Sequence, residues 1–295
     1  MKKLLTLFVA CLMAVSMIFS FGCSEDEQLA MGKEMVKYKS QLDAVRQLNN
    51  GTVHAVVIDS VMAGWYASNG DYAGKIAIVP DLILAEEEYG IAAKKGNLSI
   101  MQKINEALIA LNANGEMATI AQTFGLQDTL SITSNTTNPI TDDMVSDTAW
   151  QDILNSNNKK LVVGITIFAP IAYYKTNDNQ DPSNLTGFDI ELAKAAVDYL
   201  NTAYSTSIQI EFTTIEWSAK EGLLDNGSIH LVWNGMTITP DRQENMCISV
   251  PYLYNRQVAV VKTENVNKYS TKSSFKNAVI GVEAGSAGES VVTGK

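Results

Sequence analysis

Two charged residues have the types and neighbours needed to hold a ligand. Arg242 ends the stretch "NGMTITPDR", and its planar guanidinium can hold a carboxylate through two parallel hydrogen bonds. Asp59 ends the apolar run "AVVID", and a carboxylate there can accept hydrogen bonds from an ammonium group. By residue type alone, Arg242 could equally be a solvated turn residue and Asp59 a helix N-cap. Other features must therefore decide whether the two act together.

Histidine and cysteine offer little for a metal site or a disulfide framework. The chain has 2 His and 3 Cys, and no Cys pair has the spacing of metal ligands. Cys247 stands alone in "NMCISVPYL", and we expect it to be a buried small apolar residue. We therefore expect neither a metal nor another cofactor.

The amino end predicts export from the cytoplasm. Two lysines precede an apolar run that reaches about Phe21, and Gly22 and Cys23 follow, as in a secretory signal. The small residue before a cysteine resembles a bacterial lipoprotein signal, so residues 1–22 are predicted to be removed and Cys23 to carry lipid. Ser20 departs from this pattern, since such signals prefer Leu there. A plain transmembrane anchor is the alternative, because the run is nearly long enough to span a bilayer.

The rest of the chain has the size and charge of a two-domain protein outside the cytoplasm. Removing 22 of 295 residues leaves 273, which is long for one core and suits two domains. No second apolar stretch approaches membrane length. The 22 basic and 32 acidic residues give a net charge of −10, without a basic cluster after the signal. This argues against a nucleic-acid partner, because phosphate binding needs concentrated Lys and Arg.

An internal repeat indicates how the candidate residues are positioned. "LNNGTVHAVVID" (48–59) and "LDNGSIHLVWNG" (224–235) share Leu, Asn, Gly, His and Val at the same offsets. Each follows a helix-like stretch and runs into an apolar strand, which is one αβ step of a doubly wound sheet. Two such steps predict two lobes of similar plan, with His54 and His230 as structural residues. Chance similarity is the alternative, because Leu-x-Asn-Gly is a common helix stop.

The other segments also predict α/β architecture. "KKLVVGITIFAP" (159–170) has the β-branched composition of a buried strand that runs into a loop. Apolar residues at helical spacing predict a helix over 187–200 and two helices over 100–125, broken at an Asn-Gly pair. The stretch at about 128–150 is rich in Ser, Thr, Asn and Asp without a sustained apolar pattern, so it is predicted to be a linker.

These motifs resemble a known family, the polar amino-acid-binding proteins (solute-binding family 3) that serve as receptors of bacterial ABC importers. Its first half is resembled, in order, by "LVVGITIFAPIAYY", "LTGFDIELAKAA", "EWSAKEGLLDNGSIHLVWNGMTITPDR", "SVPYLYNRQVAVVK" and "IGVEAGSAGES". Its second half is resembled by "YKSQLDAVRQLNNGTVHAVVIDSVMAGWY" and "EEEYGIAAKKGNLSIMQKINEALIALNANGEMATIAQTFG". The resemblance implies a two-lobed α/β fold of the periplasmic-binding-protein type II, with a doubly wound sheet in each lobe and ligand in the cleft.

The two halves stand in reversed order. The segment that resembles the second half comes first, and the one that resembles the first half ends at Lys295. Joining Lys295 to about Glu25 would restore the family's order, so the chain resembles a circular permutation. A tandem duplication that lost its outer halves, an engineered permutant, a collapsed gene assembly and a truncated tandem protein would all give this order.

The resemblance also implies boundaries for the two lobes. One lobe is expected to contain residues 88–255 without interruption. The other is expected to combine 24–84 with 259–295, and the chain would cross between lobes near 85–88 and 255–259. The new chain ends would then fall in one exposed helix–strand connection, where permutation is best tolerated.

The resemblance gives a role to each of nine residues in a site for a zwitterionic amino acid. Arg242 would hold the ligand carboxylate and Asp59 its ammonium group. Phe168 and Trp217 match the aromatic residues that sandwich the ligand side chain in the family. The remaining positions, which supply backbone groups, a hydroxyl or the opposite wall, are Gly235, Met236, Thr237, Glu283 and Ser286.

Some positions depart from the family pattern and bear on the ligand. Ile165 stands where receptors for lysine and arginine often carry an acid, which argues against those ligands. Glu283 stands where Gln is frequent and could hold a cationic or amide side chain. Ala287 replaces a hydroxyl residue and so removes one hydrogen bond. The joint presence of Arg242, Asp59 and two aromatic residues makes Gln, Arg, Lys and His the first ligands to test.

The expected function is that of a monomeric, membrane-anchored receptor outside the cytoplasm, which delivers a polar L-amino acid to an ABC permease. An enzyme on the same fold, such as a dehydratase or a cell-wall lyase, is an alternative from another class. It is disfavoured because no His lies near the site and the only paired carboxylates, Asp59 and Glu283, have binding roles. A non-functional piece of a tandem receptor is the third possibility.

Overall fold

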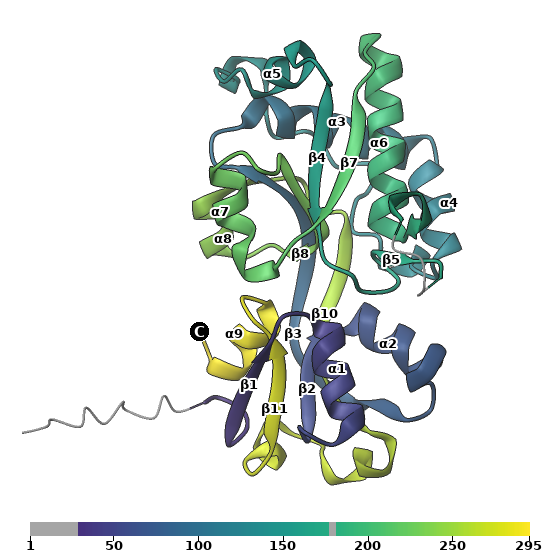
Figure 1. The fold of residues 1–295 in the computed structure, drawn as a ribbon, viewed down its shortest axis with the longest axis vertical. Helices are drawn as coiled ribbons and strands as arrows, with labels where there is room; N and C mark the ends of the chain where they lie inside the picture. Colours follow the sequence, from purple (N-terminus) through teal and green to yellow (C-terminus); the bar gives the residue numbers. More distant parts are fainter. Residues whose placement is uncertain (1–28, 177–180) are drawn as a thin grey trace, which may run out of the picture.

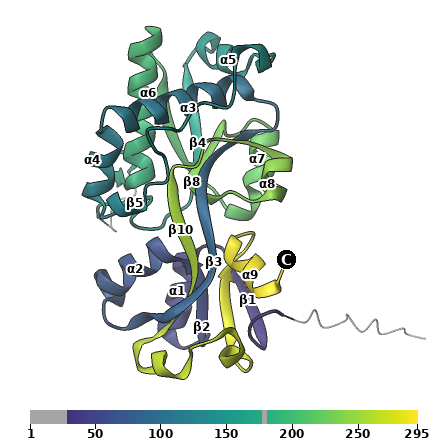
Figure 2. The same cartoon turned by 180° about the vertical axis from the view of Figure 1, so that it is seen from behind.

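The computed structural model describes residues 29–176 and 181–295, so the predicted signal peptide and Cys23 lie outside the described residues. The fold is mixed α/β, as the sequence predicts. Helices and strands gather in two bodies, one above the other, with two long strands between them (Figure 1, and from behind in Figure 2). No helix in the described ranges has the length and apolar character needed to cross a bilayer.

The lower body in Figure 1, here called the terminal body, is built from both ends of the chain. Purple strands from the start of the chain lie beside yellow strands from its end. Its main elements are β1 (Glu34–Tyr38), α1 (Gln41–Asn50), β2 (Ala55–Asp59), α2 (Ser60–Ser68), β11 (Val279–Glu283) and α9 (Ala287–Thr293).

The upper body, here called the central body, comes from the middle of the chain. Its helices are α3 (Leu98–Ala113), α4 (Glu116–Thr123), α5 (Ala149–Asn155), α6 (Phe188–Tyr204), α7 (Lys220–Asp225) and α8 (Pro240–Asn245). Its strands are β4 (Lys160–Ile165), β5 (Tyr173–Tyr174), β6 (Leu185–Thr186), β7 (Gln209–Thr214), β8 (Leu231–Thr237) and β9 (Met246–Ile248). The helix break predicted within 100–125 is present, because Gly115 has a φ of 85° between α3 and α4.

One sheet runs through both bodies, with the strand order β1–β11–β2–β10–β3–β8–β4–β7, and β9 also pairs with β3. The two long strands are β3 (Ile76–Lys94) and β10 (Leu253–Lys262). They are antiparallel, pair Glu87 with Asn255, and connect the two bodies (Figure 1). A separate two-stranded sheet joins β5 and β6.

The two bodies contain βαβαβ units of the same topology. In the central body the chain runs β4–α6–β7–α7–β8, and β4 pairs in parallel with both β7 and β8. In the terminal body the corresponding path is β11–α9, then β1–α1–β2, and β11 pairs in parallel with both β1 and β2. The described chain ends at Lys295 and begins at Leu29 between α9 and β1.

The internal repeat corresponds to the same step in each unit. Gly51 and Gly227 have φ values of 82° and 75°, so each ends its helix in the left-handed region that favours glycine. The strands that follow, β2 and β8, are buried at every residue. This burial explains the apolar runs at 55–58 and 231–233.

The stretch predicted to be a polar linker, 128–150, is instead folded onto the central body. Backbone N–H of Ser131 donates to the carbonyl of Tyr252 at 3.2 Å. The Asp147 carboxylate accepts a hydrogen bond from the backbone N–H of Ser99 at 2.9 Å. Its few apolar side chains are irregularly spaced, so they show no period in the sequence, yet three are buried: Ile132, Ile140 and Trp150.

Candidate functional site

Residues that end or follow the parallel strands of both bodies line one cavity. Asp59 ends β2, Glu283 ends β11 and Thr237 ends β8, while Phe168 and Trp217 follow β4 and β7. Loops at the carboxyl ends of parallel strands are where α/β sheets place ligands. The cavity is lined by Gln41, Asp59, Thr166, Phe168, Trp217, Asn234, Gly235, Thr237, Arg242, Glu283, Ser286 and Ala287.

This cavity is narrow because the two bodies touch around it. Its volume of about 10 Å³ is roughly the room that one water molecule needs. Arg242 and Lys220, from the central body, both donate to the carbonyl oxygen of Gly285 in the terminal body, at 3.1 and 3.4 Å. An exposed ion pair between Lys39 and Glu216 also joins the bodies, at 2.7 Å.

Eight of the nine residues predicted to bind ligand line the cavity, and Met236 does not. Met236 lies between Gly235 and Thr237 on β8, and successive strand residues face opposite sides of a sheet. Its side chain is fully buried in an apolar cluster that includes Leu224 and Val232. Met236 is therefore a core residue in this structure. Ile165 is also buried and lies outside this lining.

Arg242 is held in place by contacts from both bodies. It lies in the first turn of α8, where the side chain of Thr239 caps the helix by accepting from the Arg242 backbone N–H. Its Nη1 donates to the carbonyl oxygen of Thr237 at 2.7 Å, and its Nη2 donates to Gly285. Burial lowers the pKa of the guanidinium, yet an arginine keeps its charge in proteins. The residue thus supplies an oriented cation on the central side.

Asp59 is a buried carboxylate surrounded by amide donors. Gln41 donates to its Oδ2, while Asn255 and Gln257 donate to its Oδ1 at 2.7 and 2.5 Å. The same two amides donate to Oε1 of Glu87, at 2.6 and 2.7 Å. Burial, and next the charge of Glu87, raise the pKa of Asp59 to about 7. Asp59 is not a helix N-cap through its side chain, since no such hydrogen bond forms at α2.

Glu283 is a second buried carboxyl group on the terminal side. Its side chain is 3 % exposed, and within residues 29–176 and 181–295 its Oε1 has no hydrogen-bond partner. Burial raises the pKa of Glu283 to about 8, and the charge of Asp59 adds to this. Lys220, Gln41 and Arg242 act in the opposite direction.

Two aromatic residues, Phe168 and Trp217, and Gly235 are closely packed in the lining of the cavity. Phe168 and Trp217 are 3 % and 5 % exposed, and the Arg242 guanidinium carbon lies 5.9 Å from the Trp217 ring centroid. A Cβ on Gly235 would come within 2.9 Å of the Tyr89 ring and 3.0 Å of the Phe168 ring, and its φ is 57°. Only glycine fits this position without rearrangement.

Three further residues make contacts that shape the site: Ser286, which was predicted, and Asp189 and Lys220, which were not. The Ser286 hydroxyl caps α9 by accepting from the Glu289 backbone N–H at 3.2 Å. The sequence did not single out Asp189, whose Oδ2 accepts from Gly235 N–H at 2.7 Å and so holds the carboxyl end of β8. Nor did it single out Lys220, whose ammonium lies 4.9 Å from the Trp217 ring centroid. Burial lowers the pKa of Lys220 to about 8, and the nearby Arg242 charge adds to this.

Four lining residues were not predicted, and only part of their signal is visible in the sequence. Gln41 follows β1 as Trp217 follows β7, so the repeated unit would have suggested it. Asn234 precedes Gly235 and donates to the Thr166 hydroxyl at 2.7 Å. Ala287 was noticed only as a missing hydroxyl. Nothing in the sequence distinguishes Thr166 from an ordinary strand-end residue.

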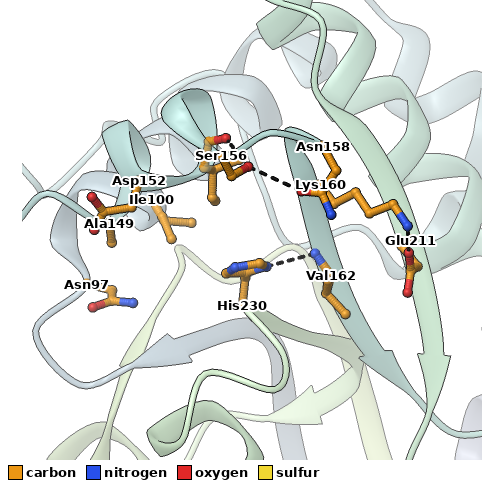
Figure 3. A pocket seen from close by; sticks show the side chains of 11 residues that line it. Asn97, Ile100, Ala149, Asp152, Ser156, Asn158, Lys160, Val162, Glu211 and His230 are labelled. Carbon is orange, nitrogen blue, oxygen red and sulfur yellow. Dashed lines mark hydrogen bonds and ion pairs between the residues drawn. The ribbon is translucent and has the colours of Figure 1, made fainter.

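Two larger hollows lie outside this cavity. A groove of about 740 Å³ opens beside it between the bodies, shares Thr166 with it, and carries five aromatic side chains: Trp65, Tyr66, Tyr72, Tyr173 and Tyr174. A pocket of about 510 Å³ lies in the central body beside His230 (Figure 3). There the His230 ring points toward β4, and its Nδ1 accepts from Val162 N–H at 2.9 Å.

The histidines and the cysteine have structural surroundings. The Nδ1 of His54 accepts from Val279 N–H at 2.9 Å, which matches the contact of His230 with Val162 in the other body. Cys247 is half-buried rather than buried, and burial raises the pKa of its thiol to about 11. The described part of the chain contains no cluster of His, Cys, Asp and Glu that could hold a metal ion.

Comparison with known proteins finds relatives for part of the chain. Residues 161–282 match the sequence model of the bacterial extracellular solute-binding proteins, family 3, so this part of the chain is homologous to that family. The arginine-binding extracellular protein ArtP of Bacillus subtilis (strain 168) is 31% identical over 134 residues, which are 45% of this chain and 48% of ArtP. The chain spans about half the length of the curated relatives it matches.

Solved structures give partial matches of the same kind. An ABC transporter substrate-binding protein of Streptococcus pneumoniae with bound histidine is 29% identical, over 32% of this chain and 34% of that one, with a TM-score of 0.26. An ancestral cyclohexadienyl dehydratase is 30% identical, over 29% of this chain and 31% of that one, with a TM-score of 0.23. The relatives are thus mostly named as binding proteins, although a dehydratase is among them.

Proposed function

We propose that this protein is a receptor outside the cytoplasm that captures a polar L-amino acid for an ABC permease. The observation that carries the proposal is the placement of Arg242 and Asp59, which line one cavity from opposite bodies. A zwitterion between them would present its carboxylate to a fixed guanidinium and its ammonium group to a buried carboxylate. The names of the matched proteins, which bind arginine or histidine, support an amino acid as ligand.

Capture would require the two bodies to separate. A cavity of about 10 Å³ cannot admit an amino acid, so the contacts to Gly285 and the Lys39–Glu216 ion pair must open first. The two strands β3 and β10 are the connections about which the bodies would hinge. Closure on the ligand would then bring Asp59 and Glu283 toward Arg242 and exclude water, which strengthens each charged contact.

The two bodies would correspond to the two lobes of the family fold, in circularly permuted order. The central body would be the lobe at 88–255, and the terminal body would combine 24–84 with 259–295. Backbone N–H groups of Ala30 and Met31 donate to the carbonyl oxygen of Val292, at 2.9 and 3.2 Å, which supports a former continuity between α9 and β1. Lipidation of Cys23, the permease partner and a monomeric state belong to the same proposal.

Isothermal titration calorimetry against all twenty amino acids tests the function. We expect micromolar or tighter binding of at least one polar L-amino acid. Absence of binding to every amino acid would reject the receptor function and favour a non-functional piece of a tandem protein.

A further inference from the structure

Glu283 is the acidic group of the cavity that the binding of a bare zwitterion leaves unexplained. Asn234, also in the lining, has an Oδ1 that is likewise without a hydrogen-bond partner among the described residues, but it carries no charge. Glu283 lies at the end of β11, lines the cavity and is 3 % exposed. Among the described residues, its Oε1 has no hydrogen-bond partner. A buried polar atom without a partner costs free energy, and a buried carboxylate without a partner costs more. A ligand that supplied a donor at this point would remove the cost.

If the side chain of the ligand is neutral, the cavity and the ligand together contain more acidic groups than basic groups. Under the function proposed above, the ligand carboxylate pairs with Arg242 and its ammonium group pairs with Asp59. Glu283 is then a further carboxyl group in the lining, and Arg242 is the only cation in that lining. The unmatched group is therefore acidic and lies on the terminal side.

Lys220 is the nearby cation, but it is directed elsewhere. Its Nζ donates to the carbonyl oxygens of Trp217 and Gly285, both at 3.4 Å, and lies over the Trp217 ring. Lys220 is outside the lining, and the described residues contain no ion pair between it and Glu283. Its charge therefore lowers the pKa of Glu283, but its side chain leaves the cavity beside Glu283 free for a ligand.

We infer that Glu283 recognises the side chain of the ligand and that this side chain is a cation, a guanidinium or an ammonium group. The inference rests on the proposed function and deepens it by naming the ligand class. It also predicts where the acid for such a ligand comes from: the terminal body, and not the strand of Ile165 in the central body.

The protonation of Glu283 makes this recognition dependent on pH. Four polar groups from neighbouring elements act on its carboxyl group: Gln41 of α1, Asp59 of β2, Lys220 of α7 and Arg242 of α8. Because the pKa of Glu283 is raised to about 8, much of it is protonated at neutral pH before ligand binds. A cationic side chain would favour the ionised form, so binding would release a proton into the solvent.

The test compares L-arginine with L-citrulline, which has nearly the same shape and a neutral ureido group. Calorimetry on the whole protein gives both affinities between pH 6 and pH 8. The α-groups of the two ligands are identical, so the ratio of affinities isolates the side chain from effects at Asp59 and Arg242. We expect arginine to bind at least roughly thirtyfold more tightly, as for a charge pair in a desolvated site. The ratio should rise with pH, by at most about tenfold per pH unit.

Glu283→Gln provides the decisive variant, because it keeps the shape and removes the negative charge. We expect it to lower arginine affinity by roughly thirtyfold or more, to change citrulline affinity less than about threefold, and to abolish the rise with pH. Glu264→Gln removes the same charge from an exposed position in the terminal body and should change neither affinity. Thermal unfolding without ligand verifies that each variant is folded.

Three results would overturn the inference while leaving the receptor function intact. They are tighter binding of neutral or acidic amino acids than of arginine and lysine, an unchanged arginine-to-citrulline ratio in Glu283→Gln, or an equal loss for both ligands. The last result would mean that Glu283 helps Asp59 to hold the α-ammonium group. If no amino acid binds at all, the proposed function fails as well.

Discussion

The two βαβαβ units have the same strand order but differ in how the chain connects them. In the central body, α6 follows β4 and leads without a break to β7. In the terminal body, α9 follows β11, but the next strand, β1, comes from the opposite end of the chain. The first unit is closed by a covalent connection, and the second by hydrogen bonds from Ala30 and Met31 to Val292 and by burial of Val292.

This difference shows that the parallel sheet does not need continuity at that point. Val292 is fully buried in a cluster with Met31 and Ile280, so residues from both ends of the chain share one core. The cavity residues Asp59 and Glu283 end β2 and β11, whereas the split connection lies between the end of α9 and the start of β1. The site can therefore be complete although its scaffold is assembled from two segments.

The largest expected effect is on a ligand that touches both units. Arg242→Ala, in the central body, and Asp59→Asn, in the terminal body, each remove one charged partner. Each should lower the affinity for the amino acid by roughly thirtyfold to several-thousandfold, equivalent to about 2–5 kcal/mol. Calorimetry measures this, with Arg256→Ala, an exposed arginine of β10, as the control. Binding within threefold of the parent would remove that residue from the site.

The buried carboxyl groups should make stability depend on pH, with a larger contribution from the terminal body than from the central body. The raised pKa values of Asp59 (about 7) and Glu283 (about 8) mean that the folded state keeps protons that the unfolded chain releases above about pH 4. Stability without ligand should therefore fall, by a few kcal/mol, as pH rises from about 4 to 8. The central body has Asp189, with a pKa of about 7, as the comparable group.

Thermal unfolding between pH 5 and pH 8 checks this expectation. The double variant Asp59→Asn, Glu283→Gln should flatten most of the fall and leave the part due to Asp189. Stability that rises with pH in the parent, or an unchanged slope in the double variant, would contradict the assignment.

Core substitutions on α6 and α9 compare the unit whose chain is continuous with the unit whose two segments are joined only by non-covalent contacts. Leu200→Ala on α6 removes a fully buried side chain of the continuous unit and should cost about 2–5 kcal/mol of unfolding free energy. Val292→Ala on α9 removes a smaller one and should cost about 1–3 kcal/mol. Urea unfolding measures both. A negligible cost for Val292→Ala would indicate that α9 does not hold the chain ends together in solution.

The smallest expected effects come from the paired histidines. His230 is half-buried, so His230→Ala would leave Val162 N–H without an acceptor and cost about 1–3 kcal/mol. His54 is exposed, so water can replace it at Val279, and His54→Ala should cost less than about 0.5 kcal/mol. Urea unfolding of both variants gives the comparison, and equal costs would show that exposure does not distinguish the two contacts.

Burial also lowers the pKa of His230, which gives that comparison a pH test. The folded state then binds the proton less readily than the unfolded chain, because protonated Nδ1 cannot accept from Val162. The contribution of His230 to stability should therefore decrease as pH falls below about 6.5, and this loss opposes the gain from the buried carboxyl groups. His230→Ala lacks this loss, so its stability should increase more than that of the parent as pH falls below about 6.5.

Much of the fold follows from local sequence. The apolar runs of β2 and β8 predict buried strands. Gly51, Gly115 and Gly227 mark helix ends in the sequence, and in the structure each has a positive φ. The stretch 128–150 shows the limit of this reasoning. It is held by hydrogen bonds to Ser99 of α3 and to Tyr252 just before β10, which are distant in sequence and so leave no period in the stretch itself.

The candidate site divides in the same way. Residue type and the resemblance were enough to single out Arg242 and Asp59, because few side chains can hold a carboxylate or an ammonium group. Whether Met236 faces the cavity depended on strand alternation, and the role of Asp189 depended on its contact with Gly235 of β8. Neither is visible in the order of residues.

The sequence by itself determined the strand and helix pattern, the repeat of that pattern and the charged residues available for binding. The tertiary structure decided that the two chain ends meet in one sheet and that Glu283 is buried beside Asp59 without a partner for its Oε1. The physical reason is that propensity and periodicity act between near neighbours in the chain. Desolvation and the pairing of charges depend instead on which distant segments pack together.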